Sequence, residues 1–200
     1  VDDSSPDGTA ALASSLNKKY KNIQVLLRKK KEGIGAALRD GYNAARGDYI
    51  LSSDSDLSFS VSDMIKLIKL LEEGNDLVVG SRHVSGGRYE QPTGSVKIKG
   101  FVSDYGNKLI RMVTGVNIHD FSANFRIIRR SVWESIETRE KTNSLLLEMI
   151  LKTHYKGYRV AELPVAFRDR RFGESKLNLK KEIPKFLVKL VYYSIRYRFF

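Results

Sequence analysis

Residues 47–58 read GDYILSSDSDLS, so an apolar run is followed at once by two carboxylates, Asp54 and Asp56. The apolar run predicts a short buried strand, and the Asp- and Ser-rich segment predicts the loop that ends it. Two carboxylates this close repel each other, so they are either solvated in a turn or held together by a cation. Mg²⁺ in proteins is typically bound by one or two carboxylates together with phosphate oxygens. The stretch therefore predicts either an ordinary polar turn or a metal site at the end of a strand.

Apolar runs on both sides of this strand alternate with helical patterns. Strands are predicted at 23–28, 48–53 and 76–81, and helices at 9–20, at 36–45 and from a cap at Ser62-Asp63 onward. This alternation is typical of βαβ units in an α/β fold with a mainly parallel sheet. Ligands of such sheets bind beyond the carboxyl ends of the strands. Three polar clusters are expected at those ends, namely Asp2-Asp3, Asp54-Asp56 and Ser81-Arg82.

The second half of the chain predicts helices at 95–113, 132–137 and 144–155, a strand at 158–167 and an amphipathic helix at 180–198. The first of these helices carries an apolar stripe of Ile98, Phe101, Val102, Tyr105, Leu109 and Met112. Such a stripe is more often part of a core than a membrane contact. In a membrane-associated enzyme, however, this helix would lie on the membrane with its apolar face in the headgroup region. The last helix sets apolar residues against Lys181, Lys185, Lys189 and Arg196. It is expected to lie on a membrane surface or to dock on a partner segment.

The chain has 200 residues, enough for one domain, and 35 Lys and Arg against 23 Asp and Glu give a net charge of +12. This balance indicates an anionic partner such as nucleic acid, anionic lipid or a phosphorylated small molecule. Nucleic acid is disfavoured because the sequence has no helix-turn-helix, RNP-like or zinc-finger signature. Without cysteine there is no disulfide or thiolate chemistry. The chain opens on VDDSSPDGT without a signal peptide or spanning segment, as though a preceding strand were missing.

Five segments resemble, in content and in order, the family 2 glycosyltransferases, and more narrowly the polyprenyl-phosphate glycosyltransferases that include the dolichyl-phosphate mannose synthases. The segments are VDDSSPDGT, EGIGAALRDGYNAARGDYILSSDSDLS, VVGSRHVSGG, DFSANFRIIRR and FRDRRFGESKL. The resemblance implies a GT-A (Rossmann-like) nucleotide-sugar-binding fold over residues 1–178, followed by an amphipathic membrane-interface helix over 179–200. It also implies inverting transfer of a hexose to a polyprenyl (dolichyl) phosphate, with GDP-mannose favoured over UDP-glucose as the donor.

The resemblance assigns roles on the donor side of the reaction to residues of three segments. Asp2 and Asp3 match an acidic pair that contacts the nucleoside of the nucleotide sugar. Asp54 and Asp56 match a pair that binds Mg²⁺ or Mn²⁺, and Ser58 falls where the family has a polar residue near the metal. Asp56 also belongs to the expected catalytic set.

On the acceptor side, the resemblance assigns roles mainly to basic residues. Arg82 matches a catalytic basic residue near the donor and acceptor phosphates. Arg170 and Lys176 match catalytic residues that close over the diphosphate. Lys99 and Ser103 fall near residues that meet the lipid phosphate. These roles predict a peripheral enzyme at the cytoplasmic face of a membrane, compatible with an anchoring segment or subunit.

The chain departs from the family pattern at several points. The family's first strand is absent, so part of the nucleobase pocket is expected to be missing, and the chain could be a stable fragment with little activity. Lys99 replaces a more usual Arg, which removes bidentate phosphate binding there. Asn124 stands where Gly is common. Gly33, followed by Ile34-Gly35, lacks the full dinucleotide motif and predicts a tight turn beside the nucleotide pocket.

The acceptor decides whether a general base is required. A lipid phosphate is already an oxyanion at pH 7, since its second pKa is about 6, and needs only cations and an in-line approach. A family 2 transferase with an alcohol acceptor would call for a carboxylate base near HDFSANF, where Asp120 is the candidate. The three histidines, His83, His119 and His154, match no metal-ligand spacing and predict structural roles.

Overall fold

The structure is a computed structural model that describes residues 1–90, 94–168, 187–193 and 195–196, with the backbone alone described for 94–99. The chain forms two compact units. The first contains residues 1–46 and 138–145, and the second contains residues 47–137 and the described part of 146–200.

The first unit holds two helices, α1 (Thr9–Tyr20) and α2 (Ile34–Ala44). The predicted bounds of α1 are confirmed. The predicted strand at 23–28 is wrong: among the residues that the structure describes, the segment makes no ladder and one isolated bridge, between Asp2 and Leu27. Asp2 N donates to Leu26 O (2.9 Å), and Arg28 N donates to Asp2 O (2.8 Å). The apolar run of this segment therefore becomes extended chain instead of a strand in a longer ladder.

Close backbone contact explains the glycines at the start of α2. Gly33, the N-cap residue, has φ of 107°, a conformation that residues with a Cβ rarely adopt. A Cβ on Gly33 would lie 2.3 Å from Lys141 O, and one on Gly35 would lie 2.3 Å from Thr142 O. The GIG segment thus forms a tight turn packed against the backbone of residues 140–142. The tight turn itself was predicted from the sequence.

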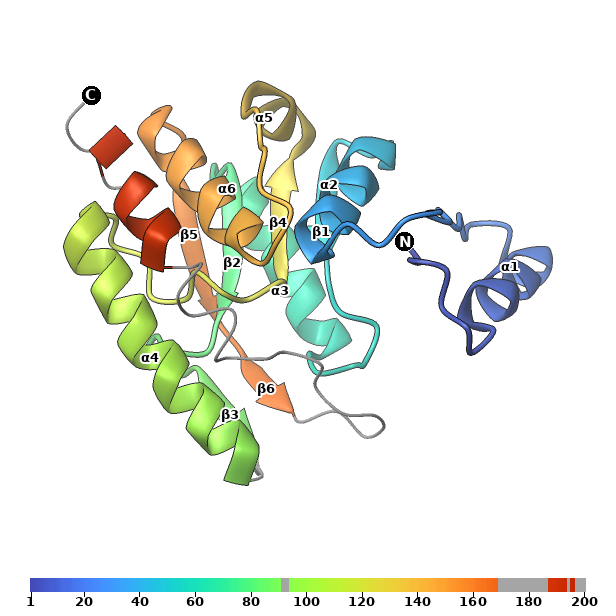
Figure 1. Ribbon diagram of the computed structural model, residues 1–200, viewed down its shortest axis with the longest axis horizontal. Coiled ribbons are helices and arrows are strands. Elements are labelled where there is room, and N and C mark those ends of the chain that lie inside the picture. The colour runs from blue at the N-terminus through green and yellow to red at the C-terminus, as the bar shows by residue number, and fades with distance from the viewer. Residues whose placement is uncertain (91–93, 169–186, 194, 197–200) are drawn as a thin grey trace. The chain divides into compact units, whose positions relative to one another are not determined.

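The second unit is built on a four-stranded sheet in the order β1-β4-β2-β5 (Figure 1). The strands are β1 (Tyr49–Ser52), β2 (Leu77–Ser81), β4 (Arg126–Arg129) and β5 (Val160–Pro164). β1, β2 and β5 run in one direction, in keeping with the predicted α/β fold, and β4 runs against both of its neighbours. Ser52 pairs with Arg126, so the beginning of β4 lies at the carboxyl end of β1.

Helices cover this sheet. α3 (Val61–Glu72) packs on β2, β4 and β5 and buries Leu67 and Leu71. Its N-cap is Ser60, whose Oγ accepts from Asp63 N (3.1 Å), so the cap predicted at Ser62-Asp63 is wrong by two residues. The short helix α5 (Arg130–Ser135) carries the buried Trp133. α6 (Ser144–Tyr155), with the predicted bounds, crosses the sheet face turned toward the viewer in Figure 1.

The helix α4 (Gly94–Thr114) corrects the interpretation of its apolar stripe as core. Phe101, Tyr105 and Met112 are 65%, 61% and 70% exposed. The buried side of the helix is instead formed by Asn107, Ile110 and Thr114. The apolar stripe and the buried side are different faces of the helix, so part of the stripe is left open to solvent.

Two short strands form a separate parallel pair, β3 (Arg88–Glu90) with β6 (Ala166–Arg168). The strand predicted at 158–167 is therefore two strands, β5 and β6, which belong to different sheets, and no strand was predicted at the position of β3. Glu90 pairs with Arg88 (2.8 Å) on its own strand and with Arg168 (2.6 Å) on the facing strand.

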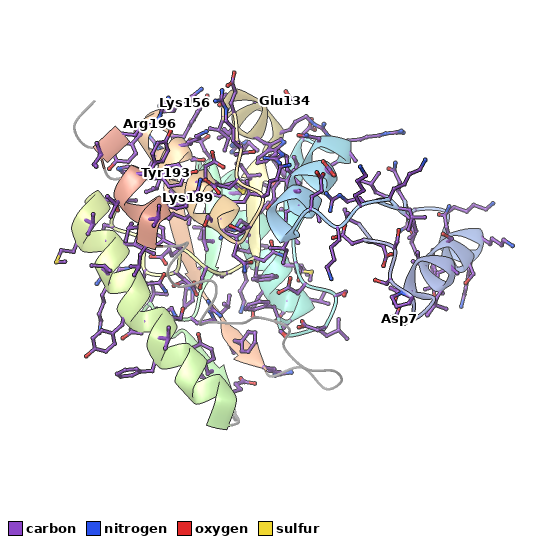
Figure 2. The ribbon with its side chains drawn as sticks, viewed as in Figure 1. Asp7, Glu134, Lys156, Lys189, Tyr193 and Arg196 are labelled. Atoms are coloured by element: carbon purple, nitrogen blue, oxygen red, sulfur yellow. The ribbon has the colours of Figure 1, made fainter. Side chains whose placement is uncertain are left out.

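Near the C-terminus, residues 187–193 and 195–196 are helical, and Figure 2 shows Lys189 and Tyr193 on this short helix. Leu190 and Tyr193 are buried, whereas Leu187, Val191 and Ile195 are exposed. Part of the predicted apolar face is thus open to solvent. Across the described residues, no helix combines the length and apolar character needed to cross a membrane.

Candidate functional site

The antiparallel strand β4 brings a third polar segment to the edge where β1 and β2 end. Asp54 and Asp56 follow β1, and Arg82 follows β2. Residues 120–125 precede β4 and, because of its direction, reach the same edge, where Gly80 N donates to Phe125 O (2.8 Å). The structure therefore collects carboxylates, an arginine and the segment DFSANF at one side of the second unit.

Arg82 is held by Asp120 in a bidentate ion pair. Its Nε donates to Asp120 Oδ2 (2.7 Å) and its Nη2 to Asp120 Oδ1 (2.9 Å). Nη2 also donates to Ser122 Oγ (2.8 Å). The guanidinium lies 5.4 Å from the ring centre of Tyr89 and 5.7 Å from that of Phe167, within range of cation–π attraction. Its position is thus defined by charge, hydrogen bonds and aromatic contacts together.

The ion pair determines the protonation states of both partners. Burial alone would raise the pKa of Asp120, but the charge and hydrogen bonds of Arg82 outweigh it and lower that pKa to about 2. Burial would lower the pKa of Arg82, but Asp120 outweighs it and raises the pKa above the ordinary arginine value. Asp120 therefore carries a negative charge at neutral pH and is a weak proton acceptor.

Another carboxylate, Glu162 on β5, whose side chain is 8% exposed, holds the backbone beside Asp120. Glu162 Oε1 accepts from Asp120 N (3.0 Å), and its Oε2 accepts from His119 N (2.9 Å). The Nδ1 atom of His119 lies 2.8 Å from Oε2. Glu162 thus fixes the main chain from which Asp120 reaches Arg82, and its contact with His119 fits the structural role predicted for that histidine.

The helix α4 contributes polar groups to the same place. Ser103 Oγ lies 3.3 Å from Ser122 Oγ and 3.2 Å from Nε2 of His83. Asn107 donates to Ser103 Oγ (3.3 Å) and accepts from Phe121 N (3.1 Å). The structure therefore joins Ser103 to Arg82 through Ser122. Burial lowers the pKa of His83, which favours its neutral form at pH 7.

The loop after β1 has a defined turn. Asp56 Oδ1 accepts from Ser58 N (3.1 Å), and Leu57 between them has φ of 57° and is 75% exposed. Ser58 is 1% exposed, and its Oγ has no hydrogen-bond partner within the described residues. Asp54 Oδ1 accepts from Asn124 Nδ2 (2.9 Å). The two carboxylates are thus held by separate hydrogen bonds, and Ser58 is almost inaccessible to solvent.

The composition of the site fits a cation shared with phosphate. Within the described residues, no group of three or more His, Asp or Glu side chains is arranged to hold a metal ion. Asp54 and Asp56 together supply the one or two carboxylates that Mg²⁺ usually takes from a protein when substrate phosphates complete its shell. The pair therefore suits a nucleotide-bound divalent cation better than an all-protein metal site.

The predicted residues of the first unit have partners within that unit. Asp3 pairs with Arg28, which is 7% exposed and also donates to Asp40 Oδ2 (2.7 Å). Asp2 Oδ1 accepts from Ser5 N (2.8 Å), which closes the turn that leads to α1. Both carboxylates thus stabilise the local fold, and their predicted nucleoside contact stays a prediction.

For three of the predicted residues the structure describes no side chain. Arg170 and Lys176 lie outside the described residues, and Lys99 belongs to the part of α4 described by its backbone alone. Conversely, sequence reasoning missed Ser122, Tyr89, Phe167 and Glu162. A carboxylate within the apolar run VAELPVAF was a signal for Glu162, since a charged residue in a strand needs a partner. The aromatic neighbours of Arg82 had no such signal, because they depend on the β3–β6 pairing.

Comparisons with known proteins agree with this arrangement. Residues 1–136 match the profile described as Glycosyl transferase family 2. The chain is 32% identical to a polyprenol monophosphomannose synthase of Mycolicibacterium smegmatis, over 99% of the chain and 76% of that protein. It is 34% identical to a dolichol-phosphate mannosyltransferase of Pyrococcus furiosus, over 90% of the chain and 50% of that protein. The chain thus spans about half the length of the archaeal relative.

Solved structures share the fold. Glucosyl-3-phosphoglycerate synthase from Mycobacterium tuberculosis, in complex with Mn²⁺, UDP and phosphoglyceric acid, superposes with a TM-score of 0.69 at 16% identity. The match covers 98% of this chain and 65% of that one. The same enzyme with Mg²⁺ and UDP gives a TM-score of 0.65. The predicted α/β fold of the GT-A class is confirmed, and the chain belongs to glycosyltransferase family 2.

Proposed function

We propose that this chain transfers a hexose from a nucleotide sugar, GDP-mannose being favoured, to a polyprenyl phosphate such as dolichyl phosphate, with inversion at the sugar. The observation that carries the proposal is the state of Asp120. This carboxylate is the candidate base for an alcohol acceptor, yet Arg82 engages both of its oxygens and its pKa is about 2. A phosphate acceptor needs no base, because it is already ionised at pH 7.

Arg82 supplies a cation for the acceptor or donor phosphate. Its Nε and Nη2 donate to Asp120 and Ser122, and none of the described residues accepts from Nη1. Two N–H donors thus remain for phosphate oxygens, and arginine is suited to such recognition. With the guanidinium fixed in advance, the phosphate oxyanion can be held for in-line attack on the sugar's anomeric carbon.

Asp54 and Asp56 would hold Mg²⁺ or Mn²⁺ against the donor diphosphate. When bound, the cation would neutralise charge on the departing nucleoside diphosphate. The relatives' names, polyprenol monophosphomannose synthase and dolichol-phosphate mannosyltransferase, support mannose and a polyprenyl phosphate as the transferred sugar and acceptor.

The exposed side of α4 supports a membrane-bound acceptor. Phe101, Tyr105 and Met112 are spaced at one and three turns of the helix and are all exposed, and Lys108 and Arg111 lie among them in the sequence. Apolar and basic residues together favour the headgroup region of an anionic membrane. Ser103 lies on the inward side of the same helix, beside Ser122 and Asn107. A polyprenyl phosphate held in the membrane along α4, at the cytoplasmic face, would therefore lie close to the site.

The test measures nucleotide binding first and transfer second. Calorimetry with GDP and with UDP, each with and without Mn²⁺, compares the chain with Asp56→Ala and with Asp48→Ala, a matched change at an exposed aspartate. We expect Mn²⁺-dependent binding of GDP that Asp56→Ala abolishes and Asp48→Ala keeps. Binding of UDP in place of GDP would redirect the proposal to UDP-glucose.

Transfer is then assayed with labelled sugar donor on dolichyl phosphate and on dolichol, which differ only in the phosphate. We expect product from dolichyl phosphate alone. Transfer to dolichol, or nucleotide binding without any need for metal, would contradict the proposal.

A further inference from the structure

Asn124 connects one carboxylate of the candidate metal pair to the end of strand β1. It lies two residues before β4, where its Nδ2 donates to Asp54 Oδ1 (2.9 Å). Its Oδ1 accepts from Ser52 Oγ (2.7 Å), and Ser52 is the last residue of β1. One side chain thus bridges the rigid end of a strand and a carboxylate in the loop that follows it.

The chemistry of the three groups fixes the direction of both hydrogen bonds. An ionised carboxylate can only accept, so the amide atom that faces Asp54 must be the NH₂ group. The amide oxygen therefore faces Ser52, whose hydroxyl must donate. The chain of donors runs from Ser52 through Asn124 to Asp54, and reversing the amide would place two acceptors against each other.

We propose that Asn124 is a positioning residue for the divalent cation, because it engages one oxygen of Asp54 and would leave the other oxygen for the metal. The inference rests on the proposed function, since it takes Asp54 as a metal ligand. Groups that hydrogen-bond a ligating carboxylate orient it, and their loss typically costs 10- to 100-fold in metal affinity.

The hydrogen bond between Asn124 and Asp54 is expected to contribute more to metal affinity than to folding stability. Asp54 is exposed, so water competes for its hydrogen bond and the net gain in folding stability is small. Fixing the side chain beforehand, however, removes an ordering cost that would otherwise weaken cation binding. A residue without a side-chain amide at this position could not make the contact.

The test measures Mn²⁺ affinity directly, by the electron paramagnetic resonance signal of free Mn²⁺ during titration in the presence of GDP or UDP. The variants are Asn124→Ala, Ser52→Ala and the double change, with Asn117→Ala as a matched control at an exposed asparagine. We expect Asn124→Ala to weaken Mn²⁺ binding roughly tenfold or more. Ser52→Ala should weaken it less, and should have no further effect in the Asn124→Ala background, because it acts through Asn124.

Thermal unfolding without metal separates positioning from loss of fold. Asn124→Ala should leave the unfolding midpoint close to that of the unchanged chain, and Asn124→Gly provides a second variant if the alanine form unfolds. Unchanged Mn²⁺ affinity in a folded Asn124 variant overturns the inference. Asp54→Ala distinguishes failure of the metal site from failure of the role of Asn124. If Asp54→Ala binds Mn²⁺ normally, the proposed metal site is wrong. If Asp54→Ala loses Mn²⁺ binding while the Asn124 variants keep it, only the role of Asn124 is wrong.

Discussion

At the scale of single residues, Arg82 and Asp120 act as one unit. Asp120 is fully buried and the side chain of Arg82 is only 13% exposed, so either charge without the other would be costly. The hydrogen bonds to Asp120 and Ser122 use Nε and Nη2 of Arg82, and the third nitrogen, Nη1, takes no part in them. In the proposed reaction Asp120 would act by holding the Arg82 cation, because its low pKa disfavours the alternative role as a proton acceptor.

Asp120→Asn tests this role. The variant keeps the shape of the side chain but leaves Arg82 without its counter-charge, so we expect the free energy of unfolding to fall by about 3 kcal/mol. Transfer to polyprenyl phosphate should fall on the order of 10²-fold, because the guanidinium is no longer fixed. Denaturant unfolding and the transfer assay measure the two effects.

Metal-dependent nucleotide binding provides the control for Asp120→Asn. It should persist under conditions where the variant is folded, since Asp54 and Asp56 are unchanged. Loss of nucleotide binding together with transfer in the folded variant would instead contradict a role of Asp120 that acts through Arg82 alone.

At the scale of elements, helix caps set where the chain turns away from the carboxylate loop. Ser60 ends that loop and begins α3, so it defines the exit of the segment that contains Asp54 and Asp56. The sequence predicted the cap at Ser62-Asp63, two residues after the observed one. The structure selects Ser60, because its backbone is extended and its Oγ accepts from Asp63 N.

Ser60→Ala should lower the free energy of unfolding by about 1 kcal/mol, the usual cost of losing an N-cap. Ser62→Ala is the matched control: it removes only a contact with Ser60 Oγ at 2.8 Å, and its effect should stay within about 0.5 kcal/mol. Urea unfolding of both variants measures the difference. Equal losses from the two variants would contradict the assignment of the cap.

At the scale of the whole molecule, the free energy of unfolding is expected to depend on pH through the buried carboxylate of Asp120. The pKa of Asp120 falls from an ordinary value near 3.8 to about 2 on folding, so its contribution is present above pH 4 and lost as the pH falls toward 2. The loss should amount to about 2 kcal/mol. Urea unfolding midpoints measured from pH 5 to pH 2.5 should show this step in the unchanged chain and lack it in Asp120→Asn.

Local pattern predicted the elements better than their pairing. The bounds of α1 and α6 were predicted because their periodicity is local, whereas the strand at 23–28 failed because a strand also needs a partner along its length. The antiparallel direction of β4 could not be predicted from the sequence, because tertiary contacts decide which strands pair and in which direction. For the same reason the sequence nominated Asp120 but could not choose its role, which depends on Arg82, 38 residues away.

The direct pairing of β2 with β4 bears on how such an enzyme can diversify. Leu77 pairs with Ile128 and Val78 with Ile127, so the two strands close the sheet without help from the excursion between them. That excursion carries α4, with Ser103 and the exposed aromatic side chains. Its length and composition can change while the ladder and the carboxylate loop after β1 persist. If α4 receives the acceptor as proposed, the middle of this excursion could vary to suit other acceptors, while residues at its two ends, Arg82 and Asn124, would keep their places beside Asp120 and Asp54.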